Sequence, residues 1–130
     1  MISITSKSPY ALAALVELHR LGDRAPVPIA ELARRREIPV QFLEQLFATL
    51  RKGGLLRSQR GVKGGYSFAR PADEITVLEL VELLDGAVGR GSSGVFADAA
   101  QAARSVLAQS TVAEIAEAEA HAATAPMYHI

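Results

Sequence analysis

One stretch of the sequence, GGLLRSQRGVKGGYSFAR from Gly53 to Arg70, has residue types that suit the binding of a polyanion. It contains Arg57, Arg60, Lys63 and Arg70 together with five glycines, and it has no Asp or Glu. Positive side chains neutralise phosphate groups, and glycine lets a backbone approach an anion closely. We therefore expect this stretch to face a nucleic acid or another polyanion.

A nucleotide-binding phosphate loop is the alternative for the segment from Gly61 to Gly65. Such a loop needs the pattern Gly-x-x-x-x-Gly-Lys-Ser/Thr between a strand and a helix. The pattern here is incomplete, and no strand–loop–helix unit can be recognised around it. The sequence favours a hairpin tip instead.

Catalytic and metal-binding chemistry finds little support elsewhere. The absence of cysteine removes disulfides, thiolate metal ligands and cysteine nucleophiles. His19, His121 and His129 lack the close spacing of a zinc site. We therefore predict that the chain is not an enzyme, and we predict no metal and no cofactor.

The charges that could bind a polyanion are concentrated in the first half of a formally neutral chain. Residues 1–70 hold 12 Lys/Arg and 5 Asp/Glu, a net charge of +7, whereas residues 71–130 hold 2 and 9, a net charge of −7. Such asymmetry predicts one part that faces a polyanion and one that does something else. Salt bridges between the two halves are the alternative explanation.

The 130 residues, 49% of them hydrophobic, suggest a single domain of ordinary size. No apolar run approaches the ~18 residues of a transmembrane helix, and the first residues do not resemble a secretory signal. A cytoplasmic protein without a membrane partner is expected.

Hydrophobic periodicity predicts three helices before the glycine-rich stretch. The first begins at Ser8-Pro9 and ends near Gly22, the second covers about 28–36, and the third covers about 39–52. The third helix has an inward apolar stripe and an outward polar face, which are Leu43, Leu46, Phe47 and Leu50, and Gln41, Glu44, Gln45, Ala48 and Lys52 respectively. Two helices joined by a short turn, the second with a polar face, predict a helix-turn-helix.

The stretch that follows predicts a β-hairpin, because residues 55–59 and 66–69 can be strands and residues 60–65 their glycine-rich tip. A hairpin directly after a helix-turn-helix is a winged helix. The fold class is therefore mainly α with a small β-hairpin, a winged helix-turn-helix domain over residues 1–86 followed by C-terminal dimerisation helices.

The C-terminal part is predicted to be helical and to form a homodimer. Capping boxes at Thr76–Glu79 and Thr111–Glu114 begin two helices, and a further helix covers about 95–109. Residues 87–94 are read as a flexible linker, 95–122 as the dimerisation and terminal helices, and 123–130 as a tail. One face of the helix at 95–109 has little else to bury against, and we assign it to the dimer interface: Phe96, Ala99, Ala100, Ala103, Val106 and Leu107. Packing of this face on the first helix of the same chain is the alternative.

Together these motifs resemble the Rrf2 family of bacterial transcription regulators. The resemblance rests on residues 6–11, 42–46, 50–55, 60–66 and 75–79, whose order and spacing agree over roughly residues 1–86 and then fade. It implies a winged helix-turn-helix homodimer that binds double-stranded DNA at a partly palindromic operator. The residues expected to contact DNA are Ser6, Lys7, Tyr10, Pro39, Gln41, Phe42, Glu44, Gln45, Arg51, Lys52, Arg57, Ser58, Arg60, Gly61, Lys63, Gly64, Gly65 and Tyr66.

The sequence departs from the family after the fourth predicted helix. Many members carry three cysteines there and bind an iron–sulfur cluster, whereas residues 86–96 are shortened here and contain Ser92 and Ser93. A cluster held by thiolates is excluded for this chain. We expect a sequence-specific regulator, a repressor that responds to another signal, such as a small molecule or a partner protein, or that represses constitutively. A protein-interaction module on a winged-helix scaffold is the alternative.

Overall fold

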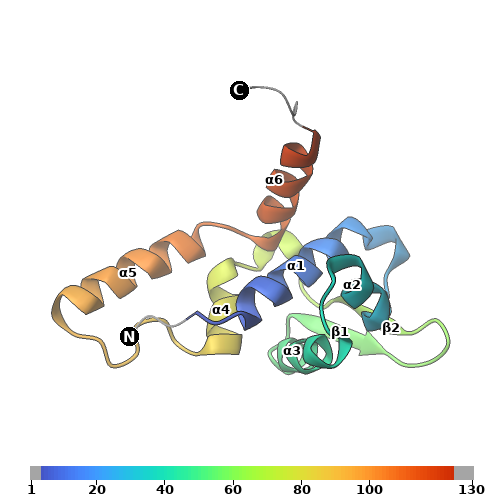
Figure 1. Cartoon of the computed structure of the whole chain (residues 1–130), viewed down its shortest axis with the longest axis horizontal. Helices are drawn as coiled ribbons and strands as arrows, with labels where there is room; N and C mark the ends of the chain where they lie inside the picture. The colour runs from blue at the N-terminus through green and yellow to red at the C-terminus, as the bar shows by residue number, and fades with distance from the viewer. Residues whose placement is uncertain (1–3, 125–130) are drawn as a thin grey trace.

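Helix α1 (Lys7–Arg20) lies at the centre of the computed structural model, which describes residues 4–124 (Figure 1). The apolar side chains that it buries lie on several of its sides, and they are Ala11, Ala14, Leu15, Val16 and Leu18. Helices α2 (Ile29–Arg36), α3 (Val40–Lys52), α4 (Val77–Asp85) and α6 (Val112–Thr124) pack around it. The observed bounds of α2 and α3 agree with the predicted bounds to within about one residue, and α4 begins directly after its predicted cap Thr76.

The start of α1 differs from the prediction. The helix begins at Lys7, and Ser6 is its N-cap residue without a side-chain cap bond. Ser8 lies inside the first turn, and its hydroxyl donates to the carboxylate of Asp85. The helix therefore begins one residue before the predicted start at Ser8-Pro9, and Ser8 serves a tertiary contact inside the first turn.

A two-stranded antiparallel hairpin follows α3, and it consists of β1 (Leu56–Gln59) and β2 (Gly65–Phe68). The hairpin also pairs with Val27, whose N–H donates to the Tyr66 carbonyl at 2.9 Å and whose carbonyl accepts from the Tyr66 N–H at 2.8 Å. Gly65 allows this close approach, because a Cβ there would lie 2.3 Å from the Val27 carbonyl carbon. The hairpin was predicted and its bridge to Val27 was not.

Two short 3-10 helices, Gly22–Arg24 and Ala72–Glu74, were also missed by the sequence analysis. The second precedes α4, whose capping box is present as predicted, with the Thr76 hydroxyl accepting from the Glu79 N–H at 3.1 Å and a Glu79 carboxylate oxygen accepting from the Thr76 N–H at 3.0 Å. The Thr111–Glu114 box at the start of α6 is present in the same form.

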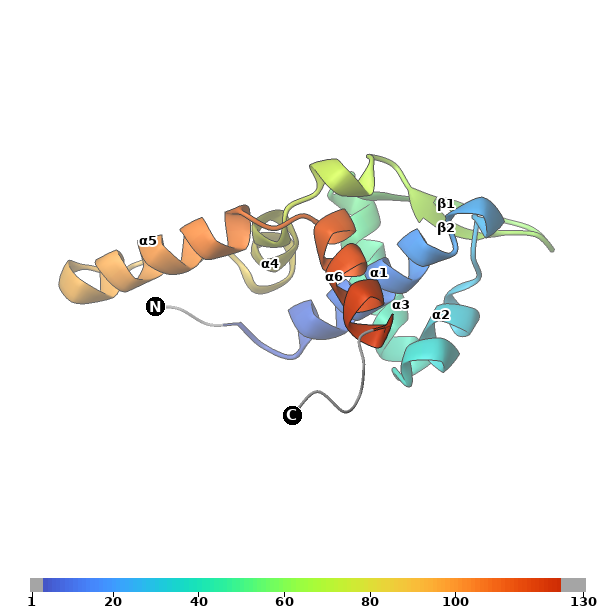
Figure 2. The ribbon, with the colours of Figure 1, turned by 90° about the horizontal axis from the view of Figure 1, so that it is seen from above.

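Helix α5 (Gly94–Ala108) extends away from the rest of the chain, on the side opposite to the hairpin (Figure 2). It contacts α4 through a small second core formed by Val81, Val88 and Ala100. Within the segment predicted as a linker, Val88 is buried and its N–H donates to the Glu82 carboxylate at 3.2 Å, which also pairs with Arg104. These contacts fix the end of the segment that adjoins α4.

The fold class is confirmed as mainly α with one β-hairpin in the described range. Within residues 4–124, no helix has the length and apolar character that crossing a membrane requires. His129 and most of the predicted tail lie outside the described residues.

Candidate nucleic-acid interface

Helix α3 presents a polar face to solvent and an apolar face to the core. Gln41, Glu44 and Gln45 are exposed, whereas its apolar stripe is buried against α1 and the neighbouring elements: Leu43, Leu46, Phe47 and Leu50. A helix that is fixed on one side and polar on the other can enter the major groove, where amide side chains read base edges. The structure thus brings these three predicted contacts to one surface.

Phe42 and Tyr10 form an aromatic contact between α3 and α1. Their rings meet edge to face with centroids 5.7 Å apart, Phe42 is half-buried and Tyr10 is 41% exposed. Both were predicted to contact DNA. The pair braces α3 against α1, so at least Phe42 has a structural role as well.

The hairpin tip carries its charges into solvent. Arg60, Gly61 and Lys63 are exposed, and the Gly64 N–H donates to the Gly61 carbonyl at 3.0 Å to close the tip. Gly64 is required here, because a Cβ would lie 2.2 Å from the Gln59 carbonyl oxygen.

The base of the hairpin is held by the core. Tyr66 is half-buried with its ring 5.1 Å from that of Phe47, so its ring is engaged in packing. Ser58 pairs with Tyr66 and is exposed, and the exposed Arg57, one residue nearer the base, donates to the Ala69 carbonyl at 3.5 Å. The hairpin therefore combines an anchored base with an exposed cationic tip.

Cations at the predicted interface have no acidic partner within 4 Å among residues 4–124. They are exposed and are Lys7, Arg51, Lys52, Arg57, Arg60 and Lys63. In contrast, Arg20, Arg36 and Arg70 pair with Glu119 or Glu79 of the acidic half. Salt bridges between the halves thus account for part of the charge asymmetry and leave this surface positive.

The start of α1 adjoins α3 at the same surface. Ser6, Lys7 and Pro39 are exposed. A hollow of about 230 Å³ lies between the start of α1, α3 and the end of α4. It is lined by Lys7, Phe42, Gln45, Leu46, Thr49, Leu83 and Leu84. Helix α3 and the hairpin lie on one side of α1, and α6 lies on the other (Figure 1).

The predicted dimer face of α5 divides into two sets. Ala100 is buried against α4, and Ala103 and Leu107 are half-buried in the same cluster. Phe96 and Val106 are 71% and 65% exposed, and Ala99 is exposed as well. Packing within the chain therefore explains the first set, against α4 and not against α1 as the alternative had it, and the second set remains available to a partner.

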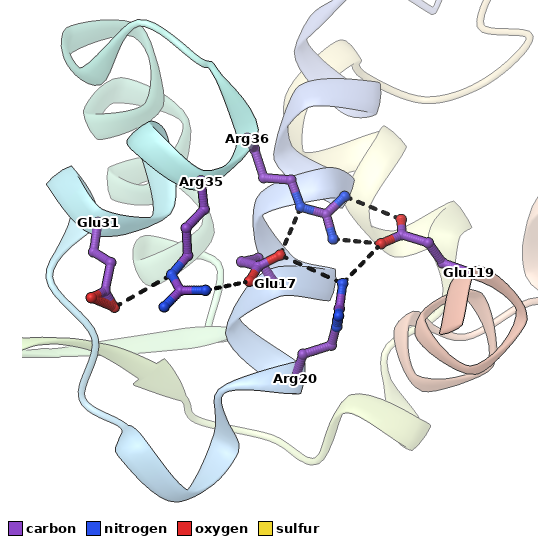
Figure 3. Close-up of polar contacts among 6 residues, drawn as sticks. All are labelled: Glu17, Arg20, Glu31, Arg35, Arg36 and Glu119. Carbon is purple, nitrogen blue, oxygen red and sulfur yellow. Dashed lines mark hydrogen bonds and ion pairs between the residues drawn. The ribbon is translucent and has the colours of Figure 1, made fainter. Parts of the chain in front are cut away.

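A cluster of ion pairs that joins α1, α2 and α6 was missed by the sequence analysis (Figure 3). Arg36 of α2 lies between Glu17 of α1 and Glu119 of α6, and Arg20 and Arg35 complete the cluster around Glu17. The hydrogen bond to Arg36 lowers the pKa of Glu119. Sequence patterns showed no sign of this cluster, because nothing local links position 36 to position 119.

The segment after α4 does not fit an iron–sulfur cluster. It offers no thiolate, since the chain has no cysteine. Across residues 4–124, no three His, Asp or Glu side chains are grouped as metal ligands.

These features define a winged helix-turn-helix protein. The profile of the Rrf2 family, described as an iron-dependent transcriptional regulator, matches residues 4–118, and the chain belongs to this family. The match extends beyond residue 86, where the similarity was expected to fade. The Rrf2 resemblance inferred from the motifs is thereby confirmed, and its members are transcription regulators, a non-enzymatic class.

Individual relatives agree with this assignment. The chain is 41% identical over 85 residues to the transcriptional regulator IscR of Photorhabdus laumondii, a match that covers 65% of this chain and 52% of that protein. It is 40% identical over 101 residues to IscR of Cereibacter sphaeroides, covering 72% and 64%. The matches thus span about half to two thirds of the length of these curated relatives.

Solved structures show the same fold. T. potens IscR superposes with a TM-score of 0.83 at 30% identity, covering 98% of this chain and 95% of that one. The B. subtilis global cysteine regulator CymR superposes with a TM-score of 0.81 at 26% identity, covering 90% and 98%.

Proposed function

We propose that this transcription regulator binds DNA sequence-specifically as a homodimer at a partly palindromic operator and represses by blocking promoter access. One observation carries the proposal: the polar face of α3 and the unpaired cations of the hairpin tip share one surface. Phosphate neutralisation supplies affinity, and base contacts supply specificity. The surface offers groups for both.

Each part of the surface has a chemical role in this proposal. Gln41 and Gln45 present amides that suit adenine edges, and Glu44 can accept a hydrogen bond from a cytosine amino group. Arg60 at the tip suits the narrow, negative minor groove. Lys7 and the other exposed cations would contact phosphates.

The homodimer is supported by the exposed part of α5. Phe96 and Val106 leave large apolar surfaces in solvent on a helix that extends away from the body. A C2 dimer would cover such a face and would present two copies of α3 to two half-sites. We keep residues 1–86 as the DNA-binding part and residues 95–122 as the dimerisation part, joined by 87–94.

The controlling signal in this proposal is not a cluster held by cysteine. No thiolate is present in this chain to hold such a cluster, and the names of the IscR and CymR relatives do not specify the signal. A small molecule or a protein partner is the class of effector that remains.

A binding experiment with selected DNA tests the proposal. The full chain first selects duplexes from a random pool, and fluorescence anisotropy then measures its affinity for the selected duplex and for a random duplex over a range of salt concentrations. We expect a preference for the selected duplex and a steep loss of affinity with salt. Gln45→Ala should weaken binding to the selected duplex more than to the random one, and Gln101→Ala on exposed α5 is the matched control.

The rival function makes the opposite prediction. A protein-interaction module on a winged-helix scaffold would show no DNA affinity even at low salt. Equal losses on both duplexes for Gln45→Ala would remove the base-reading role of α3 and leave a non-specific DNA-binding protein.

A further inference from the structure

Asp85, the last residue of α4, holds two hydroxyl groups that lie on either side of the start of α1. Thr5 Oγ1 donates to Asp85 Oδ1 at 2.6 Å, and Ser8 Oγ donates to Asp85 Oδ2 at 2.7 Å. Thr5 Oγ1 in turn accepts the Lys7 N–H at 3.2 Å. One carboxylate therefore fixes both ends of a four-residue segment.

The two residues inside this segment are Ser6 and Lys7, and both are exposed. Ser6 makes no side-chain cap bond, so its hydroxyl is not used by the helix. Lys7 lines the hollow of about 230 Å³ together with Gln45 and Thr49 of α3. The segment held by Asp85 therefore borders the outward face of α3.

The clamp depends on the ionised carboxylate. Burial of Asp85 opposes its ionisation, but hydrogen bonds from Thr5 and Ser8 and the charge of Lys7 outweigh this and lower the pKa of Asp85. Only the carboxylate has two oxygens that can each accept a hydroxyl hydrogen bond. A negative group at a helix N-terminus is also favourable for the helix dipole.

We propose that Asp85 is a positioning residue for DNA binding, which holds the start of α1 so that Ser6 and Lys7 reach the phosphate backbone while α3 occupies the groove. This inference rests on the proposed DNA-binding function and adds a residue that does not touch DNA itself. Because phosphate contacts carry no sequence information, Asp85 acts on affinity and not on base preference.

The sign of the effect separates positioning from simple electrostatics. Asp85 is a negative charge close to a surface that would face phosphate. If it acted only through its charge, Asp85→Asn would strengthen DNA binding, because it removes repulsion. If it positions Ser6 and Lys7, the same substitution weakens binding.

The experiment compares Asp85→Asn, Ser8→Ala and the double variant in the full chain, with the selected and random duplexes described above. We expect each single variant to bind both duplexes about 5- to 10-fold more weakly, the size of one lost hydrogen bond, with the salt slope reduced by about 1. The double variant should bind about as weakly as Asp85→Asn alone, since that substitution already removes the carboxylate oxygen that accepts the Ser8 hydroxyl. Asp23→Asn, at an exposed position beyond the C-terminal end of α1, makes the same charge change away from this surface and should leave affinity unchanged.

Other outcomes overturn the inference. Tighter or unchanged binding by Asp85→Asn, or losses that add fully in the double variant, would show that Asp85 does not act through Ser8 on this segment. Circular dichroism and a melting curve establish whether each variant is folded at the assay temperature. If Asp85→Asn is not folded, Ser8→Ala serves as the test. Absence of DNA binding by the unaltered chain would instead refute the proposed function.

Discussion

Arg36 forms a bidentate ion pair with Glu119, in which Nη2 donates to Oε1 at 2.6 Å and Nη1 donates to Oε2 at 3.1 Å. The same side chain donates from Nε to Glu17 Oε1 at 2.9 Å. One residue of the helix-turn-helix thereby joins α1 and the terminal helix α6 (Figure 3). The Glu17 side chain is only 9% exposed, and its carboxylate lies within 4 Å of the guanidinium groups of Arg20, Arg35 and Arg36.

Arg36→Met should destabilise the protein by about 1–3 kcal/mol, because it keeps the apolar stem but removes the best partner of a nearly buried carboxylate. Arg20 and Arg35 remain near Glu17 and limit the loss. Urea unfolding followed by circular dichroism measures the change in the free energy of unfolding. Arg34→Met is the matched control on the same helix, since Arg34 is exposed and forms no ion pair within residues 4–124. Equal destabilisation by the two variants would show that the bridge contributes nothing specific.

The contribution of Glu119 should depend on pH. Its hydrogen bond from Arg36 lowers its pKa from the ordinary value of 4.5. A depressed folded-state pKa means that the stabilisation is present above the unfolded value and is lost as the pH falls through the folded value. We expect the free energy of unfolding of the unaltered protein to exceed that of Glu119→Gln by about 0.5–1 kcal/mol at neutral pH. The difference is small because this pair is partly exposed, and it should shrink below about pH 4.5. Urea unfolding of both proteins across this range is the measurement, and a constant difference would contradict the assignment.

Gly65→Ala should disrupt the pairing of the hairpin with Val27. The added Cβ would lie 2.3 Å from the Val27 carbonyl carbon, and Gly65 has a φ of 153°, so both the space and the backbone conformation oppose a side chain. We expect a loss of about 2 kcal/mol or more, measured by thermal unfolding. Gly22→Ala is the control, because that position has no atom within 4 Å of an added Cβ. A melting temperature equal to that of the control would show that the hairpin shifts without cost.

Local patterns predicted the elements of this fold well. The apolar stripe from Leu43 to Leu50, the two capping boxes and the glycine-rich tip each have a signal within a few residues. Contacts between distant positions have no such signal. Arg36 with Glu119, Asp85 with Ser8, and Val27 with Tyr66 were all missed, since each depends on the packing of whole elements.

The candidate site shows the same division. Exposure of Gln41, Gln45 and Arg60 follows from helix period and turn composition, both of which are local. The packing of Phe42 and Ala100 within the chain does not follow from local patterns. An aromatic or small residue looks the same in sequence whether it faces a partner or its own chain.

Arg60→Ala should weaken binding to the selected duplex and leave the fold unchanged. Arg60 is exposed at the hairpin tip and has no acidic partner in the described part of the chain, so its removal costs no internal contact. Loss of a minor-groove arginine should reduce affinity by about 10-fold and lower the salt slope by about 1. Anisotropy at several salt concentrations measures both quantities. Arg24→Ala, another exposed arginine outside the predicted interface, controls for net charge, and unchanged affinity for Arg60→Ala would remove the hairpin tip from the interface.

Phe96→Asp should convert the proposed homodimer into a monomer. Phe96 is 71% exposed on α5, where a partner helix would bury it, and an unpaired charge in an apolar interface costs several kcal/mol. Sedimentation velocity at a fixed protein concentration should show the mass of one chain for the variant and of two for the unaltered protein. Val62→Asp makes an equivalent change at the hairpin tip and should leave the dimer intact. A dimer that persists in Phe96→Asp would place the interface elsewhere, and a monomeric unaltered protein would refute the dimer itself.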